Sequence, residues 1–162
     1  MTSRLNVSIK ADTQALKDVQ KGLSKAGYVK VGVLGNEASR GEEGINNAEL
    51  GAVQEFGSAS KNIPPRSFLR APLEGDKKQI IKALQSKAVK KAIEEGNAEA
   101  ALELVGIAAE GVVDEAFATS GGGTWAANKP STVRKKGSSR PLVDTGELRR
   151  SITSEVISGE KT

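Results

Sequence analysis

The chain has to build its core mostly from small side chains. Its 162 residues include 20 alanines and 18 glycines, but only five aromatics: Tyr28, Phe56, Phe68, Phe117 and Trp125. Large aromatic side chains normally dominate the buried area of a core. Because the net stability of a domain is only about 5–15 kcal/mol, such a modest core leaves little margin. We therefore expect a partner surface to contribute to the stability of this protein.

The composition also excludes several classes of enzyme. The sequence contains no histidine and no cysteine, which removes disulfide bonds, thiolate or imidazole metal sites, cysteine nucleophiles and Ser-His-Asp triads. Phosphate-binding loops are missing as well, since Gly32-Val-Leu-Gly35 lacks the spacing of a dinucleotide-binding turn. We expect a protein that is not an enzyme, with no catalytic residues, no metal site and no cofactor.

Positive charge is concentrated toward the C-terminal end. Residues 1–120 carry 16 basic and 16 acidic side chains, whereas 121–162 carry 8 basic and 4 acidic ones, which accounts for the net charge of +4. Within this stretch, 121–140 holds five cations, no acid, and several glycines and serines. Ordering a backbone costs about 1–2 kcal/mol per residue, and this composition offers little apolar surface in return. We predict a flexible, protruding basic loop that becomes ordered against a partner.

Two neighbouring stretches carry opposite charge. Six lysines lie within 77–91 and seven acidic residues within 94–115. If both stretches are helical, they can form an antiparallel hairpin whose outer faces attract each other. Alternatively, one of the charged faces meets a charged partner or a neighbouring subunit.

The spacing of apolar residues predicts a single α+β domain over 1–162. Alternating apolar and polar residues predict three strands, at 5–10, 28–34 and 152–157. Spacings of three and four predict helices at 12–26, 46–56, 67–96 with a kink near Pro72, and from 97 through Ala116. The first strand, first helix and second strand would form a β-α-β unit. The expected architecture is a small, mostly antiparallel sheet flanked by helices, with a long helical hairpin and the basic loop.

One string has the form of a catalytic loop. Leu142-Val-Asp-Thr-Gly146 is similar to the Asp-Thr-Gly loop of aspartic proteases, in which two aspartates share one proton. However, Asp144 and Glu147 also have the spacing of a capping box at the start of a short helix. We predict the structural cap, since a protease would require a second such aspartate from a dimer partner.

Trp125 and the diproline corner at Pro64-Pro65 are the candidate contact points. Trp125 lies among basic residues, so it could anchor a protein partner, pack against the core, or stack on a nucleic-acid base. At the corner, Arg66 and Arg70 flank Phe68. Either Phe68 packs inward while both arginines stay solvated, or the stiff corner presents the arginines to acidic groups of a neighbour. We favour the second alternative.

Several strings together resemble the tail-completion, or virion morphogenesis, proteins of long-tailed bacteriophages. The similarity extends over parts of 29–75 and 125–153, and the strings that carry it are Val31-Gly-Val-Leu34, Ala48-Glu-Leu50, Gln54-Glu-Phe-Gly57, Ile63-Pro-Pro-Arg-Ser-Phe-Leu-Arg70, Trp125, Lys129-Pro-Ser-Thr132 and Pro141-Leu-Val-Asp-Thr-Gly-Glu-Leu-Arg-Arg-Ser-Ile152. Gln54 stands where the family commonly has histidine, and Pro65 and Ser67 stand where it often has alanine and proline.

The resemblance implies a structural virion protein at the head-tail junction or neck. Copies of the chain would form a ring, expected to contain six subunits, around the channel through which DNA passes without specific binding. Its further partners would be the tail tube or tail terminator protein and the head-completion or connector protein. We expect assembly in the host cytoplasm and no membrane association, because the N-terminus does not resemble a signal peptide and no apolar run approaches the length of a span.

The implied contacts would involve the corner and the basic segments. The residues expected at a subunit or partner interface are Arg66, Phe68, Arg70, Trp125, Lys129, Arg134, Lys135, Lys136, Arg149 and Arg150. The alternative is a nucleic-acid-binding module that uses the loop 121–140 together with Trp125.

Overall fold

The fold combines one small sheet with several helices, which confirms the expected α+β class. The computed structural model describes residues 27–35, 45–75 and 77–159. The strand and helix expected within 5–26 lie outside these residues. The elements of the described chain are, in order, β1 (Tyr28–Val33), α2 (Asn47–Phe56), α3 (Arg70–Gly75), α4 (Lys78–Leu84), α5 (Lys87–Glu94), α6 (Ala98–Thr119), α7 (Pro130–Lys136), α8 (Glu147–Arg150) and β2 (Ile152–Ile157).

The sheet of the described chain consists of β1 and β2, which pair in antiparallel orientation. The register runs from Tyr28 opposite Ile157 to Val33 opposite Ile152. Both strands agree with the alternation of apolar and polar residues in the sequence. In β1, Tyr28 and Lys30 are exposed, whereas Val29 is half-buried. One face of the sheet therefore lies against α6, and the other carries the exposed side chains.

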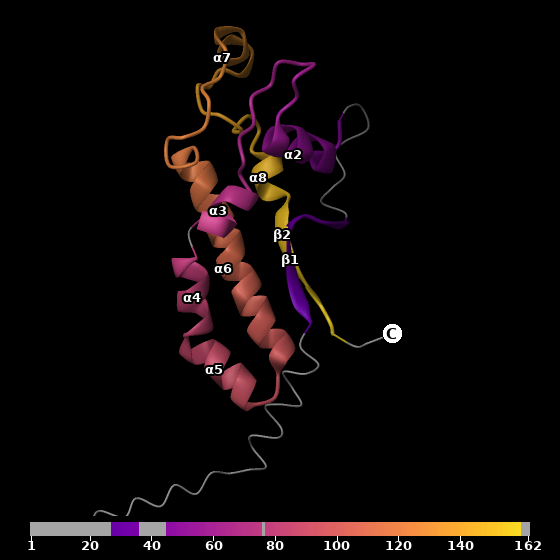
Figure 1. Ribbon diagram of the computed structural model, residues 1–162, viewed down its shortest axis with the longest axis vertical. Coiled ribbons are helices and arrows are strands. Elements are labelled where there is room, and N and C mark those ends of the chain that lie inside the picture. The colour runs from indigo at the N-terminus through magenta and orange to yellow at the C-terminus, as the bar shows by residue number, and fades with distance from the viewer. Residues whose placement is uncertain (1–26, 36–44, 76, 160–162) are drawn as a thin grey trace, which may run out of the picture.

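The long helix α6 lies between the sheet and the helices α4 and α5 (Figure 1). At Gly106, a Cβ atom would lie only 2.5 Å from the Ser154 Oγ and 3.2 Å from the Val29 Cγ1. A residue without a side chain is therefore what lets α6 approach the sheet so closely. Although α6 has 22 residues, neither it nor any other helix in the described part is long and apolar enough to cross a membrane.

The best-packed part of the core lies at the C-terminal half of α6. Here Val113 and Phe117 meet Phe68 and Leu148, and all four are buried. The rings of Phe68 and Phe117 are 5.2 Å apart between centroids and tilted by 52°, which is favourable for an aromatic pair. Two of the chain's few aromatic residues are thus concentrated where segments distant in the sequence meet.

The helices α4 and α5, here called the arm, pack along α6 and complete the expected hairpin. The sequence predicts one helix from Ser67 to Gly96, but this is wrong, because α3, α4 and α5 are separate helices. The break before α5 has a clear cause. Ser86 adopts an extended conformation, and its hydroxyl accepts a hydrogen bond from the Val89 amide at 3.2 Å, so it caps a new helix.

Helix α2 has the capping box that the sequence predicts. The Asn46 side chain accepts a hydrogen bond from the Glu49 amide at 2.7 Å, and the Glu49 carboxylate accepts one from the Asn46 amide at 3.3 Å. The helix ends at Gly57, whose φ of 77° favours glycine. A Cβ at Gly57 would lie 2.8 Å from the Ile63 oxygen, so glycine is also needed for the chain to double back toward the diproline corner.

Candidate functional site

The diproline corner, defined here as residues 63–70, is held by the buried carboxylate of Glu55. One Glu55 oxygen accepts hydrogen bonds from the amides of Phe68 at 2.8 Å and Leu69 at 3.0 Å. The other accepts from the Arg70 amide at 3.2 Å and from the Ser67 hydroxyl. This carboxylate therefore caps the start of α3 from another helix. Because Glu55 is only 7% exposed, losing it would leave buried donors without an acceptor.

Sequence reasoning did not identify this role of Glu55, although one signal was present. The residue lies in the last turn of α2, where the negative end of the helix dipole disfavours a carboxylate. A glutamate at an unfavourable helix position, shortly before a proline-rich corner, indicates a partner outside its own helix. Here that partner is the row of amides that opens α3.

The sequence suggested that Arg66 is presented to a neighbouring subunit. In the structure its side chain is buried within the protein, at 7% exposure. Its guanidinium donates from Nε to the Ala126 oxygen at 2.8 Å and from Nη2 to the Ala127 oxygen at 3.2 Å. Its Nη1 also donates to the Gln54 side-chain oxygen at 3.3 Å. The segment 126–129 belongs to neither a helix nor a strand. Its carbonyls therefore need hydrogen-bond donors from elsewhere, and Arg66 supplies them at Ala126 and Ala127. Burial lowers the pKa of Arg66.

Phe68, which was also expected at an interface, is buried at 2% exposure. It packs inward, as one of the two alternatives for the corner requires. Of the three candidate contact residues at the corner, Arg70 alone is exposed. The corner is therefore mainly an internal joint of the protein.

Trp125 packs against the core, which was one of its three possible roles. Its ring meets Phe117 edge-on, with centroids 5.7 Å apart and planes at 84°. The indole Nε1 donates to the Ser67 oxygen at 3.4 Å. With the indole engaged in these contacts, Trp125 is poorly placed to stack on a nucleic-acid base.

The basic segment 121–140 contains the helix α7 and is not a loop throughout. Pro130 occupies the first turn of α7, where its fixed φ and missing amide hydrogen favour helix formation. The expectation that this segment lacks local apolar anchoring is wrong, because Trp125 reaches the core. Arg134 and Lys135 are exposed on α7.

The two arginines of α8 both bind acceptors within the same chain. Arg149 forms an ion pair with Asp114 of α6, with 2.6 Å between the Arg149 Nη2 and the Asp114 Oδ2. This hydrogen bond is the main reason that the pKa of Asp114 is lowered and that of Arg149 is raised. The exposed Arg150 donates to the Thr145 oxygen at 3.0 Å. Both residues thus help to join α8 to its surroundings.

The predicted cap formed by Asp144 and Glu147 is wrong. Helix α8 begins at Glu147 with Gly146 as its N-cap, and no side chain caps it. The helix starts too late for Asp144, because Gly146 has a φ of 78° and turns the chain immediately before it. The Glu147 amide instead donates to the Thr145 hydroxyl at 3.4 Å.

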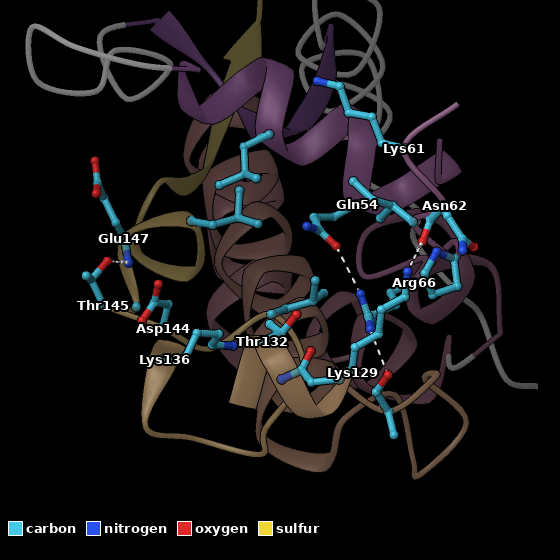
Figure 2. Close-up of a pocket in the computed structure, with 18 residues that line it drawn as sticks. Gln54, Lys61, Asn62, Arg66, Lys129, Thr132, Lys136, Asp144, Thr145 and Glu147 are labelled. Atoms are coloured by element: carbon cyan, nitrogen blue, oxygen red, sulfur yellow. Dashed lines mark hydrogen bonds between the residues drawn. The ribbon is translucent and has the colours of Figure 1, made fainter. Parts of the chain in front are cut away.

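A cavity of about 450 Å³ lies between α2, the turn before the corner, α7 and the turn before α8. It brings together several of the predicted residues, including Lys129, Lys136, Asp144 and Glu147, with Arg66 in its wall (Figure 2). Arg134, Lys135, Arg149 and Arg150 do not line it. Its formal charges are four positive, from Lys61, Arg66, Lys129 and Lys136, and two negative, from Asp144 and Glu147.

The cations of this cavity bind main-chain oxygens. The Lys129 Nζ donates to the Asn62 oxygen and the Lys136 Nζ to the Arg140 oxygen, both at 3.0 Å. Burial is the main cause of the lowered pKa of Lys136; Asp144 opposes this shift and Arg66 adds to it. In Figure 2, Lys129 lies beside Arg66, whereas the Glu147 carboxylate points away from them. Lys136 lies on the other side, next to Asp144, so positive charge is present on both sides of the cavity.

The cavity has to be interpreted from its own chemistry, since no protein-family model, no curated protein and no solved structure matches this chain. Its polar groups are mostly ammonium, guanidinium and amide donors, and its remaining walls are aliphatic. Such a combination is suited to holding an anionic group beside an apolar one.

Proposed function

We propose that the protein is a structural subunit of a bacteriophage neck or tail, a tail-completion ring subunit that joins the tail tube to the head connector around the DNA channel. One observation carries the proposal. The two stretches that resemble the tail-completion proteins, within 29–75 and 125–153, come together in one structural unit. The arm and α6 separate them in the chain.

The contacts between the two stretches are specific. Arg66 holds the backbone of 126–127, Trp125 donates to the Ser67 oxygen, and Lys129 donates to the Asn62 oxygen. Every residue that lines the cavity comes from 50–66 or 127–148. The resemblance therefore refers to one connected part of the protein, which supports a shared architecture more strongly than scattered strings would.

The surface also supports a role in assembly. Phe56 is 69% exposed and Ile107 is 61% exposed. Covering such large apolar side chains with a partner surface is favourable and would stabilise the complex. The small core gives the same indication, because a subunit whose own core is modest is stabilised when it binds its neighbours.

The proposal is tested by negative-stain imaging of the purified protein, alone and with tail tubes of a long-tailed phage that lack their completion protein. We expect rings, or tube ends closed by a cap. If neither rings nor caps form, the proposal is wrong.

A DNA-binding measurement tests the alternative function. Tight, salt-dependent binding to duplex DNA that is lost in Lys135→Ala/Lys136→Ala would support a nucleic-acid-binding module. The matched control is Lys77→Ala/Lys78→Ala, which removes the same charge outside the basic segment. Equal loss in both variants would indicate nonspecific attraction and would not support the alternative.

A further inference from the structure

Three cations lie in the wall of the cavity: the buried Arg66, the partly buried Lys136, which Asp144 attracts, and the exposed Lys129. Arg66, Lys129 and Lys136 donate to main-chain or amide oxygens, and the ion pairs found in the described part of the chain involve other residues. A guanidinium has five N–H groups, and three of those of Arg66 have acceptors. A buried charge of this kind is costly unless it is paired. The cavity therefore fits an anionic oxygen.

The remaining walls of the cavity restrict what can carry that oxygen. Leu50, Ile63 and Pro64 contribute aliphatic surface from one side, and Leu142 and Leu148 contribute it from the other. A small hydrated anion would leave this surface uncovered. A carboxylate next to an aliphatic side chain would use both kinds of wall.

The exposed face of α6 presents this combination. Glu99, Glu103, Ile107 and Glu110 follow one another at steps of four, four and three residues, so they lie on one face of the helix. Ile107 is 61% exposed in the middle of this row, and Glu99 and Glu103 are exposed as well. At about 1.5 Å per residue, Glu103 and Ile107 are separated by about 6 Å along the helix. We call this row the acidic face.

We propose that the cavity receives the acidic face of a second copy of this chain, with a glutamate opposite Arg66, Lys129 and Lys136 and with Ile107 against the aliphatic walls. This inference rests on the proposed ring. Both complementary surfaces belong to the same chain, but they lie apart: α7 is at one end of the molecule, and the N-terminal end of α6 is at the other (Figure 1). The contact is thus heterologous and joins copies head to tail, which closes into a ring when the rotation allows.

The test uses charge reversal on each surface. Lys129→Glu/Lys136→Glu alters the cavity, and Glu99→Lys/Glu103→Lys alters the acidic face. Sedimentation velocity should show that the wild-type chain self-associates and that each variant alone associates at least ~10-fold more weakly. An equimolar mixture of the two variants should associate again, because each supplies the charge that matches its partner. Circular dichroism establishes that each variant is folded, and Arg66 is left intact because it also holds the backbone.

The controls reverse equal charge elsewhere. Lys87→Glu/Lys90→Glu lies on α5 outside the cavity, and Glu94→Lys/Glu115→Lys lies outside the acidic face; both should associate like the wild type. Three results would each overturn the inference: a monomeric wild-type chain, a mixture of folded variants that stays dissociated, or controls that lose association equally. If rings or caps still form in the imaging experiment while the mixture fails, this contact is wrong and the proposed function stands.

Discussion

The corner and the arm are held in opposite ways. At the corner, the buried charged side chains of Glu55 and Arg66 bind backbone atoms at defined distances. In the arm, Val89 is the buried side chain, while Ile81 and Leu84 are about half exposed. The corner is therefore fixed by directional hydrogen bonds together with the packing of Phe68, whereas the arm is held mainly by apolar contact.

This difference shows how a chain with few aromatics can still specify one structure. Hydrophobic contact is not directional, so small side chains alone would leave the packing of segments poorly defined. A buried polar network costs desolvation, but its directional hydrogen bonds restrict the arrangement of the backbone around it. In this protein the network of Glu55 and Arg66 lies where α2, the corner and the segment 126–127 meet.

The largest effect should come from Glu55→Ala. It removes the acceptor for three amides, of which that of Phe68 is buried and those of Leu69 and Arg70 are partly buried, and each buried unsatisfied donor costs about 1–3 kcal/mol. Partial access of water would reduce the total, so we expect a loss of about 3–5 kcal/mol in the free energy of unfolding. Urea denaturation monitored by Trp125 fluorescence measures it, because the indole lies next to the corner.

The matched control is Glu49→Ala, which removes a glutamate from the same helix. Glu49 is exposed and only completes the capping box, so its loss should cost about 0.5–1 kcal/mol. If the two variants were equally stable, the Glu55 network would not be what fixes the corner.

An intermediate effect is expected in the arm from Val89→Ala. This change removes two methyl groups from a side chain that is 1% exposed, which should cost about 1–2 kcal/mol. Leu84→Ala, at a position that is 50% exposed, should change stability by less than about 0.5 kcal/mol. Hydrogen exchange should also be faster in the arm than at the corner. Equal protection of the two regions would contradict the comparison.

A small effect is expected from Asp114→Asn, which breaks the ion pair with Arg149. Because this pair lowers the pKa of folded Asp114, it stabilises the protein above the ordinary aspartate pKa of about 3.9. The contribution is lost as the pH falls through the lowered pKa. The Asp114 side chain is 55% exposed, so the loss at pH 7 should be below about 1 kcal/mol.

Denaturation of both proteins over a pH series tests this sign. The difference in stability between wild type and Asp114→Asn should shrink as the pH decreases from about 5 toward 2. A difference that grows in acid would show that the carboxylate is not stabilised by Arg149.

Local signals in the sequence predicted the elements that depend on local contacts. The capping box at Asn46 and Glu49 correctly started α2, because both of its hydrogen bonds span three residues. The alternation in β1 and β2 likewise revealed both strands. What failed were boundaries set by a single residue, such as the break at Ser86 and the turn at Gly146.

The candidate site was harder to predict because its contacts are nonlocal. Arg66 binds the carbonyls of Ala126 and Ala127, which lie 60 and 61 positions later in the chain. No local pattern in the sequence shows which backbone segment Arg66 will contact. Lys129 and Lys136 were identified from their charge, and the structure places both in the cavity wall. Their partners depend on how the turns before the corner and before α8 come together.

The pairing of β1 with β2 also has a consequence for synthesis. Ile152 follows its partner Val33 by 119 positions, and a ribosome that adds about 5–20 residues per second needs roughly 6–24 s to make that stretch. During this time β1 has been made, but β2 has not. Val29, Val31 and Val33 would then form an apolar strand that still lacks its partner β2 on each nascent chain. When many copies are made at once, early pairing between such strands competes with correct folding, so expression should improve when fewer chains are started at the same time or when spare chaperones are present.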